Sequence, residues 1–175
     1  MSRLREEDTQ MSGIPQDADK GGYEFKELSG QDLTATAVSD CIRVITKGEA
    51  VDWQSATREL PLAHFVVIVY KDTQVVGVGA IKRERRKYGA KVSKQCGVDF
   101  PPETLELGYV AVDANHRGHG LSHRIAATLL SLHKDRLFAT TYSERMKATL
   151  AKAGFVQKGT EWKGRRQMLS FWDKE

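Results

Sequence analysis

Three runs of β-branched and other apolar residues constrain the fold of this chain more than any other feature. The first two runs, HFVVIVY at 64–70 and QVVGVGAIK at 74–82, are separated by only three polar residues. Such runs joined by a short polar link predict an antiparallel β-hairpin. The third run, LELGYVAV at 105–112, predicts a further strand that ends just before a glycine-rich turn.

Shorter patterns on either side of these runs predict the rest of the fold. Ser29 and Asp32 have the spacing of a capping box, which predicts that the first helix begins there and ends near Gly48. Residues 1–22 are interpreted as a disordered leader before a single domain at 23–175. The expected order is β-α-α-β-β-β-α-β-α-β-β, an α+β fold with one mixed, mostly antiparallel sheet flanked by helices. The other expected elements lie at 23–28, 53–60, 121–134, 137–143, 144–153, 155–164 and 165–172.

Length and composition place few limits on function. With 175 residues, of which 40% are apolar and 29% are charged, the chain has the size and balance of one globular domain. No apolar run approaches the roughly 20 residues that a bilayer span requires. The polar N-terminus also lacks the apolar segment of a secretory signal. We therefore expect a cytoplasmic protein without membrane contact, as a monomer or a homodimer.

The cysteines and histidines predict neither a disulfide nor a metal site. Cys41 falls in an apolar helical stripe and is expected to be buried, whereas Cys96 is expected in a polar loop where it can be exposed. His116 and His119 flank the glycine-rich turn, where they either contact a bound anion or are solvated turn residues. No pair of histidines has the spacing of metal ligands, so we expect no metal.

One segment carries most of the positive charge. Residues 82–94, KRERRKYGAKVSK, hold seven Lys or Arg against one Glu, whereas the net charge of the whole chain is only +4. We interpret this segment as a loop between two strands. It is either a solvated hairpin extension or a contact surface for an acidic acceptor or an RNA, with Tyr88 available for stacking on a base.

The glycine-rich turn carries the clearest functional signal. The sequence Arg117-Gly118-His119-Gly120-Leu121-Ser122 follows a strand and opens a helix. Glycines allow a tight turn, and the first N–H groups of a helix attract anions, so this arrangement predicts a phosphate or pyrophosphate site. Arg117 can add a charge-assisted hydrogen bond. Taken alone, the same pattern is also compatible with an ordinary turn.

The order of the elements around this turn resembles the GNAT superfamily of N-acyltransferases. The signature of that family, Arg/Gln-x-x-Gly-x-Gly/Ala, follows its fourth strand and opens its third helix. RGHGLS matches the Arg and the first required Gly, and has Ser122 where Gly or Ala is usual. The segment KAGF at 152–155 is similar to the family's Lys-x-Gly-Phe. The resemblance extends from about Tyr23 to Trp172.

The resemblance implies acetyl-CoA or a related acyl-CoA as the cofactor. It implies that the fourth and fifth strands splay apart to admit the pantetheine arm, with the acyl carbonyl near Tyr109 and Val110. The backbone of residues 110–112 would pair with that arm, and the amides of residues 117–122 would hold the pyrophosphate. The cofactor-binding residues implied are Val110, Ala111, Val112, Arg117, Gly118, His119, Gly120, Leu121 and Ser122.

The resemblance also indicates where catalytic groups should lie. Glu106 stands at the position of the general base in the histone acetyltransferase branch, and the alternative is an exposed Glu on a sheet face. The Tyr that many members use as the acid is replaced by Leu150, and Ser143 stands where Asn is common. Tyr142 is nearby in sequence, but strand alternation can aim it elsewhere.

These observations favour an enzyme that transfers an acetyl group from acetyl-CoA to a primary amine, with Glu106 as base. The acceptor is a small molecule, a peptide or protein, or an aminoacyl-tRNA. The alternative is a CoA-binding or RNA-binding module with weak catalysis, which Leu150 favours. A tRNA-acetylating toxin is a third reading, suggested by the basic residues 82–94.

Overall fold

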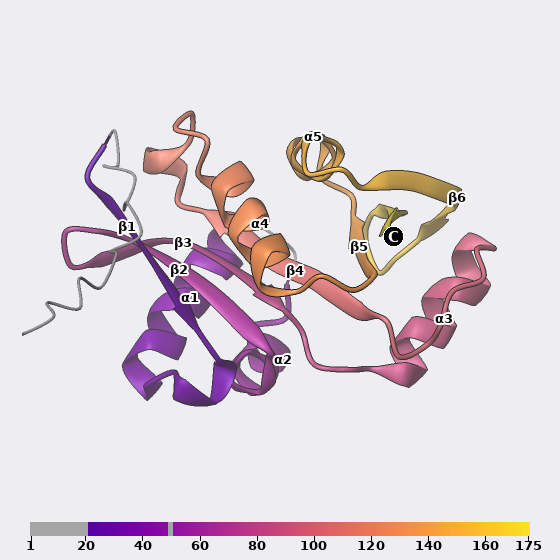
Figure 1. The fold of residues 1–175 in the computed structure, drawn as a ribbon, viewed down its shortest axis with the longest axis horizontal. Helices are drawn as coiled ribbons and strands as arrows, with labels where there is room; N and C mark the ends of the chain where they lie inside the picture. Colours follow the sequence, from indigo (N-terminus) through magenta and orange to yellow (C-terminus); the bar gives the residue numbers. More distant parts are fainter. Residues whose placement is uncertain (1–20, 49–50) are drawn as a thin grey trace, which may run out of the picture.

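The computed structural model describes residues 21–48 and 51–175, which form one seven-stranded sheet with helices packed on it (Figure 1). The strand order is β1-β2-β3-β4-β5-β7-β6, and every neighbouring pair is antiparallel except the parallel pair β4–β5. The expected α+β fold is thereby confirmed. The strands are β1 (Tyr23–Leu28), β2 (Phe65–Lys71), β3 (Gln74–Ile81), β4 (Leu105–Val112), β5 (Leu137–Thr141), β6 (Val156–Lys163) and β7 (Met168–Lys174). The helices are α1 (Ala35–Gly48), α2 (Trp53–Glu59), α3 (Arg86–Cys96), α4 (Leu121–Leu132) and α5 (Glu144–Lys152).

Helices cover both faces of the sheet and bury three apolar clusters. On one face, α4 and α5 pack on the middle strands through Leu121, Ile125, Leu129 and Leu150. On the opposite face, α1 and α2 cover β2 and β3 with an aliphatic cluster that includes Cys41. Further along that face, α3 packs on β6 and β7, and the aromatic cluster beneath it includes Phe138 of β5 (Figure 1). None of the helices in the described residues has the length and apolarity needed to cross a bilayer.

The parallel pair β4–β5 opens toward its carboxyl end. Among the described residues, the two strands pair only at Leu105 with Leu137 and at Glu106 with Phe138. Beyond these residues β4 leads to α4 and β5 leads to α5 on diverging courses (Figure 1). An open point between parallel strands, at their carboxyl ends, is where α/β sheets commonly bind ligands. The splayed strands implied by the family resemblance are therefore present.

The sequence predicts a loop for the basic segment 82–94, and this prediction is wrong. Most of it belongs to α3, which ends at Gly97, a residue in the left-handed region with a φ of 74°. Tyr88, Val92 and Cys96 recur every four residues and pack in the aromatic cluster. The four cations of α3, Arg86, Lys87, Lys91 and Lys94, alternate with these three residues and conceal the helical period. Cys96, expected in a loop, is consequently buried in that helix.

Two further expectations concern the N-terminal part. The prediction of a capping box at Ser29 is wrong, because Ser29 precedes a short 3-10 turn and makes no side-chain cap hydrogen bond. The helix begins later, at Ala35, where the hydroxyl of Thr34 accepts a hydrogen bond from the amide of Ala37 at 3.1 Å. The predicted leader at 1–22 lies outside the described residues except for its last two positions.

Candidate active site

The glycine-rich turn leaves open space in front of α4. Gly118 and Gly120 have positive φ angles of 84° and 70°, a conformation that residues with a side chain rarely adopt. A Cβ built at either position would meet no atom within 4 Å. The backbone conformation, rather than crowding, thus requires glycine here, and the start of the helix is free to receive a ligand.

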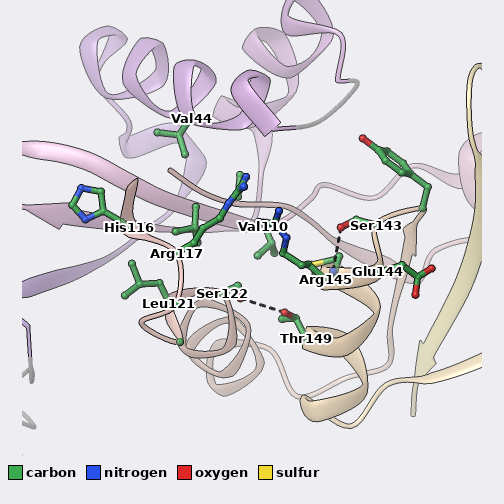
Figure 2. Close-up of a pocket in the computed structure, with 16 residues that line it drawn as sticks. Val44, Val110, His116, Arg117, Leu121, Ser122, Ser143, Glu144, Arg145 and Thr149 are labelled. Carbon is green, nitrogen blue, oxygen red and sulfur yellow. Dashed lines mark hydrogen bonds between the residues drawn. The ribbon is translucent and has the colours of Figure 1, made fainter. Parts of the chain in front are cut away.

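A cleft of about 420 Å³, which we call the α4–α5 cleft, lies beside this turn (Figure 2). It is bounded by the carboxyl end of β4, the turn before α4, and the first residues of α5. Eight of the nine predicted cofactor-binding residues line it, and His119 does not. The eight residues are Val110, Ala111, Val112, Arg117, Gly118, Gly120, Leu121 and Ser122.

The two histidines beside the turn contact β1. The hydroxyl of Tyr23 and Nδ1 of His116 are 3.0 Å apart and share a hydrogen bond. The His119 ring lies 5.7 Å from the Tyr23 ring, centroid to centroid. His116 lines the cleft but points away from its centre in Figure 2. Both rings therefore hold the turn against β1 in this structure.

The first turns of α5 supply cleft residues that the sequence did not single out. Figure 2 shows Arg145 of α5 and Arg117 both extending toward the middle of the cleft. Deeper in, the hydroxyl of Ser122 lies 3.2 Å from that of Thr149, so the two helices share a hydrogen bond. Arg145 could have been suspected because it lies two residues after Ser143, the N-cap of α5, whose hydroxyl accepts a hydrogen bond from the Met146 amide.

These residues fit a long ligand that carries a diphosphate. Two arginine side chains of like charge extend into one cleft, and an anion between them would offset their repulsion. The amides at the start of α4 add partial positive charge. Along the β4 wall, the side facing β5 is unpaired beyond Glu106 within the described chain, so an extended arm can hydrogen-bond there as an added strand.

A β-bulge in β4 changes which face its side chains occupy. Gly79 of β3 stands opposite both Tyr109 and Val110, and Tyr109 has a φ of 54°. Without the extra residue, Tyr109 would point to the α4 face, like Leu107. Instead it packs with the cluster of α1 and α2, on the side where Glu106 also lies.

A second hollow, the Glu106 cavity, adjoins the α4–α5 cleft and measures about 350 Å³. The two share Val110, Ala111, Tyr142 and Met146. Glu106 is only 5% exposed, which excludes the alternative of a solvated Glu on a sheet face. Its buried Oε2 has no hydrogen-bond partner among the described residues.

Two cations compensate the charge of this buried carboxylate. The Lys82 ammonium lies 3.3 Å from Glu106 Oε2 and the nearest Arg85 nitrogen lies 3.9 Å from it, both as ion pairs without hydrogen-bond geometry. Lys82 also sits 4.2 Å from the centroid of the Tyr109 ring. It reaches this place across Gly108, where a Cβ would come within 2.6 Å of the Lys82 Cε.

Two tyrosines in the same cavity stay neutral near physiological pH. Burial, followed by the nearby Glu106 charge, raises the pKa of Tyr109 to about 12. The Glu106 charge and then burial raise the pKa of Tyr88, whose hydroxyl lies 3.2 Å from that of Thr140. Neither phenol is therefore suited to act as a base. On the β4 side of the cavity, Glu106 is the carboxylate that could accept a proton.

The candidates for a general acid differ in position. Leu150, at the site of the usual tyrosine, is fully buried in the core and lines neither hollow. Tyr142 lines both, because β5 ends at Thr141 and the chain turns toward α5 there. Strand alternation does not determine the direction of Tyr142, because this residue lies beyond the end of β5.

Cys41 and Cys96 line neither of the two hollows. Burial raises the pKa of the Cys41 thiol to about 12, so it stays protonated. Within residues 21–48 and 51–175, no group of three or more His, Cys, Asp or Glu side chains could hold a metal ion.

Comparison with known proteins agrees with this geometry. The sequence profile of the Acetyltransferase (GNAT) family matches residues 34–155. The fold is similar to a GNAT-family acetyltransferase from Streptococcus agalactiae, with a TM-score of 0.66 and 12% identity over 86% of this chain and 94% of that one. It is also similar to an acyl-CoA N-acyltransferase from Pseudomonas aeruginosa, with a TM-score of 0.61 and 14% identity over 87% of this chain and 99% of that one. The fold is also similar to yncA, a putative acetyltransferase from Salmonella typhimurium that was solved with its cofactor acetyl-CoA. The TM-score is 0.56 and the identity is 16%, over 88% of this chain and 94% of that one. A comparison with curated proteins finds no match.

The profile match covers more than half of the chain, so this protein belongs to the GNAT acetyltransferase family. Members of this family use acyl-CoA and bind an acceptor substrate. The solved structures are all below 25% identical, and they establish the fold alone.

Proposed function

We propose that this protein is an N-acetyltransferase that transfers the acetyl group of acetyl-CoA to a primary amine. The observation that carries the proposal is the junction of two hollows at Val110, Ala111, Tyr142 and Met146. One hollow has the features of a diphosphate and pantetheine site, and the other contains a buried carboxylate with an unpartnered oxygen. An acyl donor and an amine could meet at their junction.

When bound, acetyl-CoA supplies its acetyl group as a thioester, whose C–S bond breaks as the amine nitrogen bonds to the carbonyl carbon. The amides of residues 117–122 and the Arg117 side chain would hold the diphosphate. The backbone of residues 110–112 would pair with the pantetheine arm. Glu106 would accept the proton that the attacking ammonium must lose, directly or through water. Tyr142 is our candidate donor of the proton that the leaving thiolate takes up.

Two measurements test this proposal. Isothermal titration of the protein with acetyl-CoA, compared with longer acyl-CoA thioesters, should give saturable binding that is tightest for the acetyl group. Thiol release should then rise on addition of a primary amine from a panel of small amines, peptides and aminoacyl-tRNA. Absence of acetyl-CoA binding would reject the proposal, and binding without turnover on any amine would support the alternative of a regulatory CoA-binding module.

A further inference from the structure

The Glu106 cavity contains a carboxylate oxygen without a hydrogen-bond donor and a guanidinium without a hydrogen-bond acceptor from the described residues. Glu106 Oε2 is buried without a partner, so it calls for a donor such as an ammonium. Arg85 lines the same cavity and stacks on the Tyr88 ring, with its guanidinium carbon 4.4 Å from the ring centroid. Within the described residues, this guanidinium donates no hydrogen bond to the protein and is 32% exposed, so its N–H groups are accessible to an acceptor that enters the cavity.

The excess charge in this region is positive. A neighbouring groove of about 630 Å³ at the β6–β7 hairpin shares Val51, Asp52, Tyr142 and Leu169 with the Glu106 cavity. Together the two are lined by four cations and two carboxylates. The cations are Lys82, Arg85, Arg165 and Arg166, and the carboxylates are Asp52 and Glu106. A ligand that enters this region is favoured if it carries negative charge as well as its reacting amine.

We propose that the acceptor of the acyl group is a primary amine that also carries a carboxylate, which binds to Arg85. This inference rests on the proposed function, whose acceptor class it specifies. The ammonium of the acceptor binds Glu106 Oε2, and its carboxylate, a few bonds away, binds the guanidinium. Arginine suits this role because its planar fork of donors matches a carboxylate.

Lys82 has a different role from Arg85. Its ammonium is closer to Glu106, at 3.3 Å against 3.9 Å, and its side chain is 14% exposed against 32% for Arg85. Lys82 is also covered by the Tyr109 ring and by the backbone at Gly108. Lys82 is therefore the closer and more buried counter-charge of Glu106, whereas the more exposed Arg85 also faces the space that an acceptor would fill.

The test uses pairs of amines that differ only in a carboxylate. γ-Aminobutyrate is compared with n-butylamine, and a short peptide with Asp and Glu side chains is compared with its Asn and Gln counterpart. Thiol release from acetyl-CoA is measured for each. We expect kcat/KM to be about 10- to 100-fold higher for the carboxylated member of each pair, the range for a hydrogen bond between charged groups. The peptide arm separates a free amino acid from a peptide as the source of the carboxylate.

Arg85→Gln should reduce the ratio of kcat/KM between the two members of each pair to about one, because an acceptor without a carboxylate has no contact to lose at that position. The ratio is the readout because Arg85 also lies 3.9 Å from Glu106 Oε2, so that its loss changes the turnover of both members alike. The matched control is Arg86→Gln. Arg86 is the next residue, is mostly exposed, pairs with Glu84 at 3.3 Å and does not line the cavity. This control should keep the preference of the unchanged protein. Circular dichroism of both variants checks that α3 remains folded.

Each outcome decides one of the two claims. Equal turnover of both members of a pair, or a preference that survives Arg85→Gln, overturns the carboxylate site but not the acetyltransferase. Much faster turnover of aminoacyl-tRNA than of any carboxylated amine also overturns it. If no amine is turned over, the proposed function fails. The carboxylate site is then decided by calorimetry, where equal or weaker binding of γ-aminobutyrate than of n-butylamine overturns it.

Discussion

The α4–α5 cleft and the Glu106 cavity are neighbours, yet they are built in different ways. The cleft takes most of its wall from one stretch of chain, residues 110–122, and presents backbone amides and glycines to its ligand. The cavity takes its wall from α1, α2, α3, β4, β5 and β7, and presents side chains. Backbone contacts suit a ligand that all family members share, whereas side chains set the identity of an acceptor. Changes to the two hollows should therefore separate cofactor binding from acceptor chemistry.

The largest effect is expected from filling the cleft at the start of α4. In Gly120→Trp, an indole would occupy the space in front of the first amides of the helix. We expect the Kd for acetyl-CoA, measured by calorimetry, to rise by about 100-fold or more, because the diphosphate loses those amides. The matched control is Gly97→Trp, since Gly97 also has a positive φ, of 74°, and open space at its Cβ, but ends α3 away from the cleft.

Both glycine variants carry the cost of a side chain in the left-handed region, about 1–2 kcal/mol. A common loss of thermal stability is thus expected in both, and only Gly120→Trp should lose the cofactor. If Gly120→Trp bound acetyl-CoA as tightly as the control, the cleft would not be the cofactor site.

The next largest effect concerns the cavity. In Glu106→Gln, the base is replaced by a neutral amide, and we expect kcat to fall by about 100-fold or more with the Kd for acetyl-CoA unchanged. Glu103→Gln, at an exposed position just before β4, serves as the control. A Gln leaves Lys82 and Arg85 without their counter-charge, so Glu106→Asp, which keeps the charge, is measured in parallel with thermal unfolding.

The pH dependence of this pair of variants sharpens the assignment. A carboxylate that removes a proton imposes its own ionisation on the acidic limb of the rate profile. That limb should persist in Glu106→Asp and disappear in Glu106→Gln. A profile of unchanged shape in Glu106→Gln would assign Glu106 to charge compensation rather than proton transfer.

The same contrast explains what the sequence could predict. The cleft was found because the residues from Arg117 to Ser122 are consecutive and act through the backbone, so spacing alone indicates the chemistry. Glu106 was placed by family resemblance, but its ion partner Lys82 was not. That contact depends on the register of β3 against β4, and the bulge at Tyr109 brings the ring of that residue to Lys82. Helix α3 was missed because its cations outnumber the residues that it buries.

A smaller effect is expected from the two arginines of the cleft. Arg117→Ala and Arg145→Ala should each raise the Kd for acetyl-CoA by roughly ten-fold, since each removes one charge-assisted contact at an exposed site. Arg58→Ala on the exposed side of α2 is the charge-matched control. The losses should shrink as ionic strength rises. The KM for the acceptor should not change, and a rise in that KM would mean that Arg145 serves the cavity instead.

The smallest effect is expected at Ser122, where the family usually has a residue without a hydroxyl. The hydroxyl of Ser122 pairs with Thr149 Oγ1 at 3.2 Å, and Thr149 is buried. In Ser122→Ala the Thr149 hydroxyl loses its partner, which should cost about 1–3 kcal/mol of unfolding free energy. The Kd for acetyl-CoA should change by only about two-fold. Ser131→Ala, an exposed hydroxyl of the same helix, is the control.

A double variant decides what the Ser122 hydroxyl does. If it mainly joins α4 to α5, then Thr149→Val should restore part of the stability lost in Ser122→Ala, because no buried hydroxyl is left unpaired. The Kd for acetyl-CoA should then be nearly the same in Ser122→Ala and in the double variant. If instead Ser122→Ala and the double variant lose affinity equally, by about ten-fold, the hydroxyl is a phosphate ligand, and the α4–α5 cleft then recognises its ligand through a side chain at Ser122 as well as through the backbone.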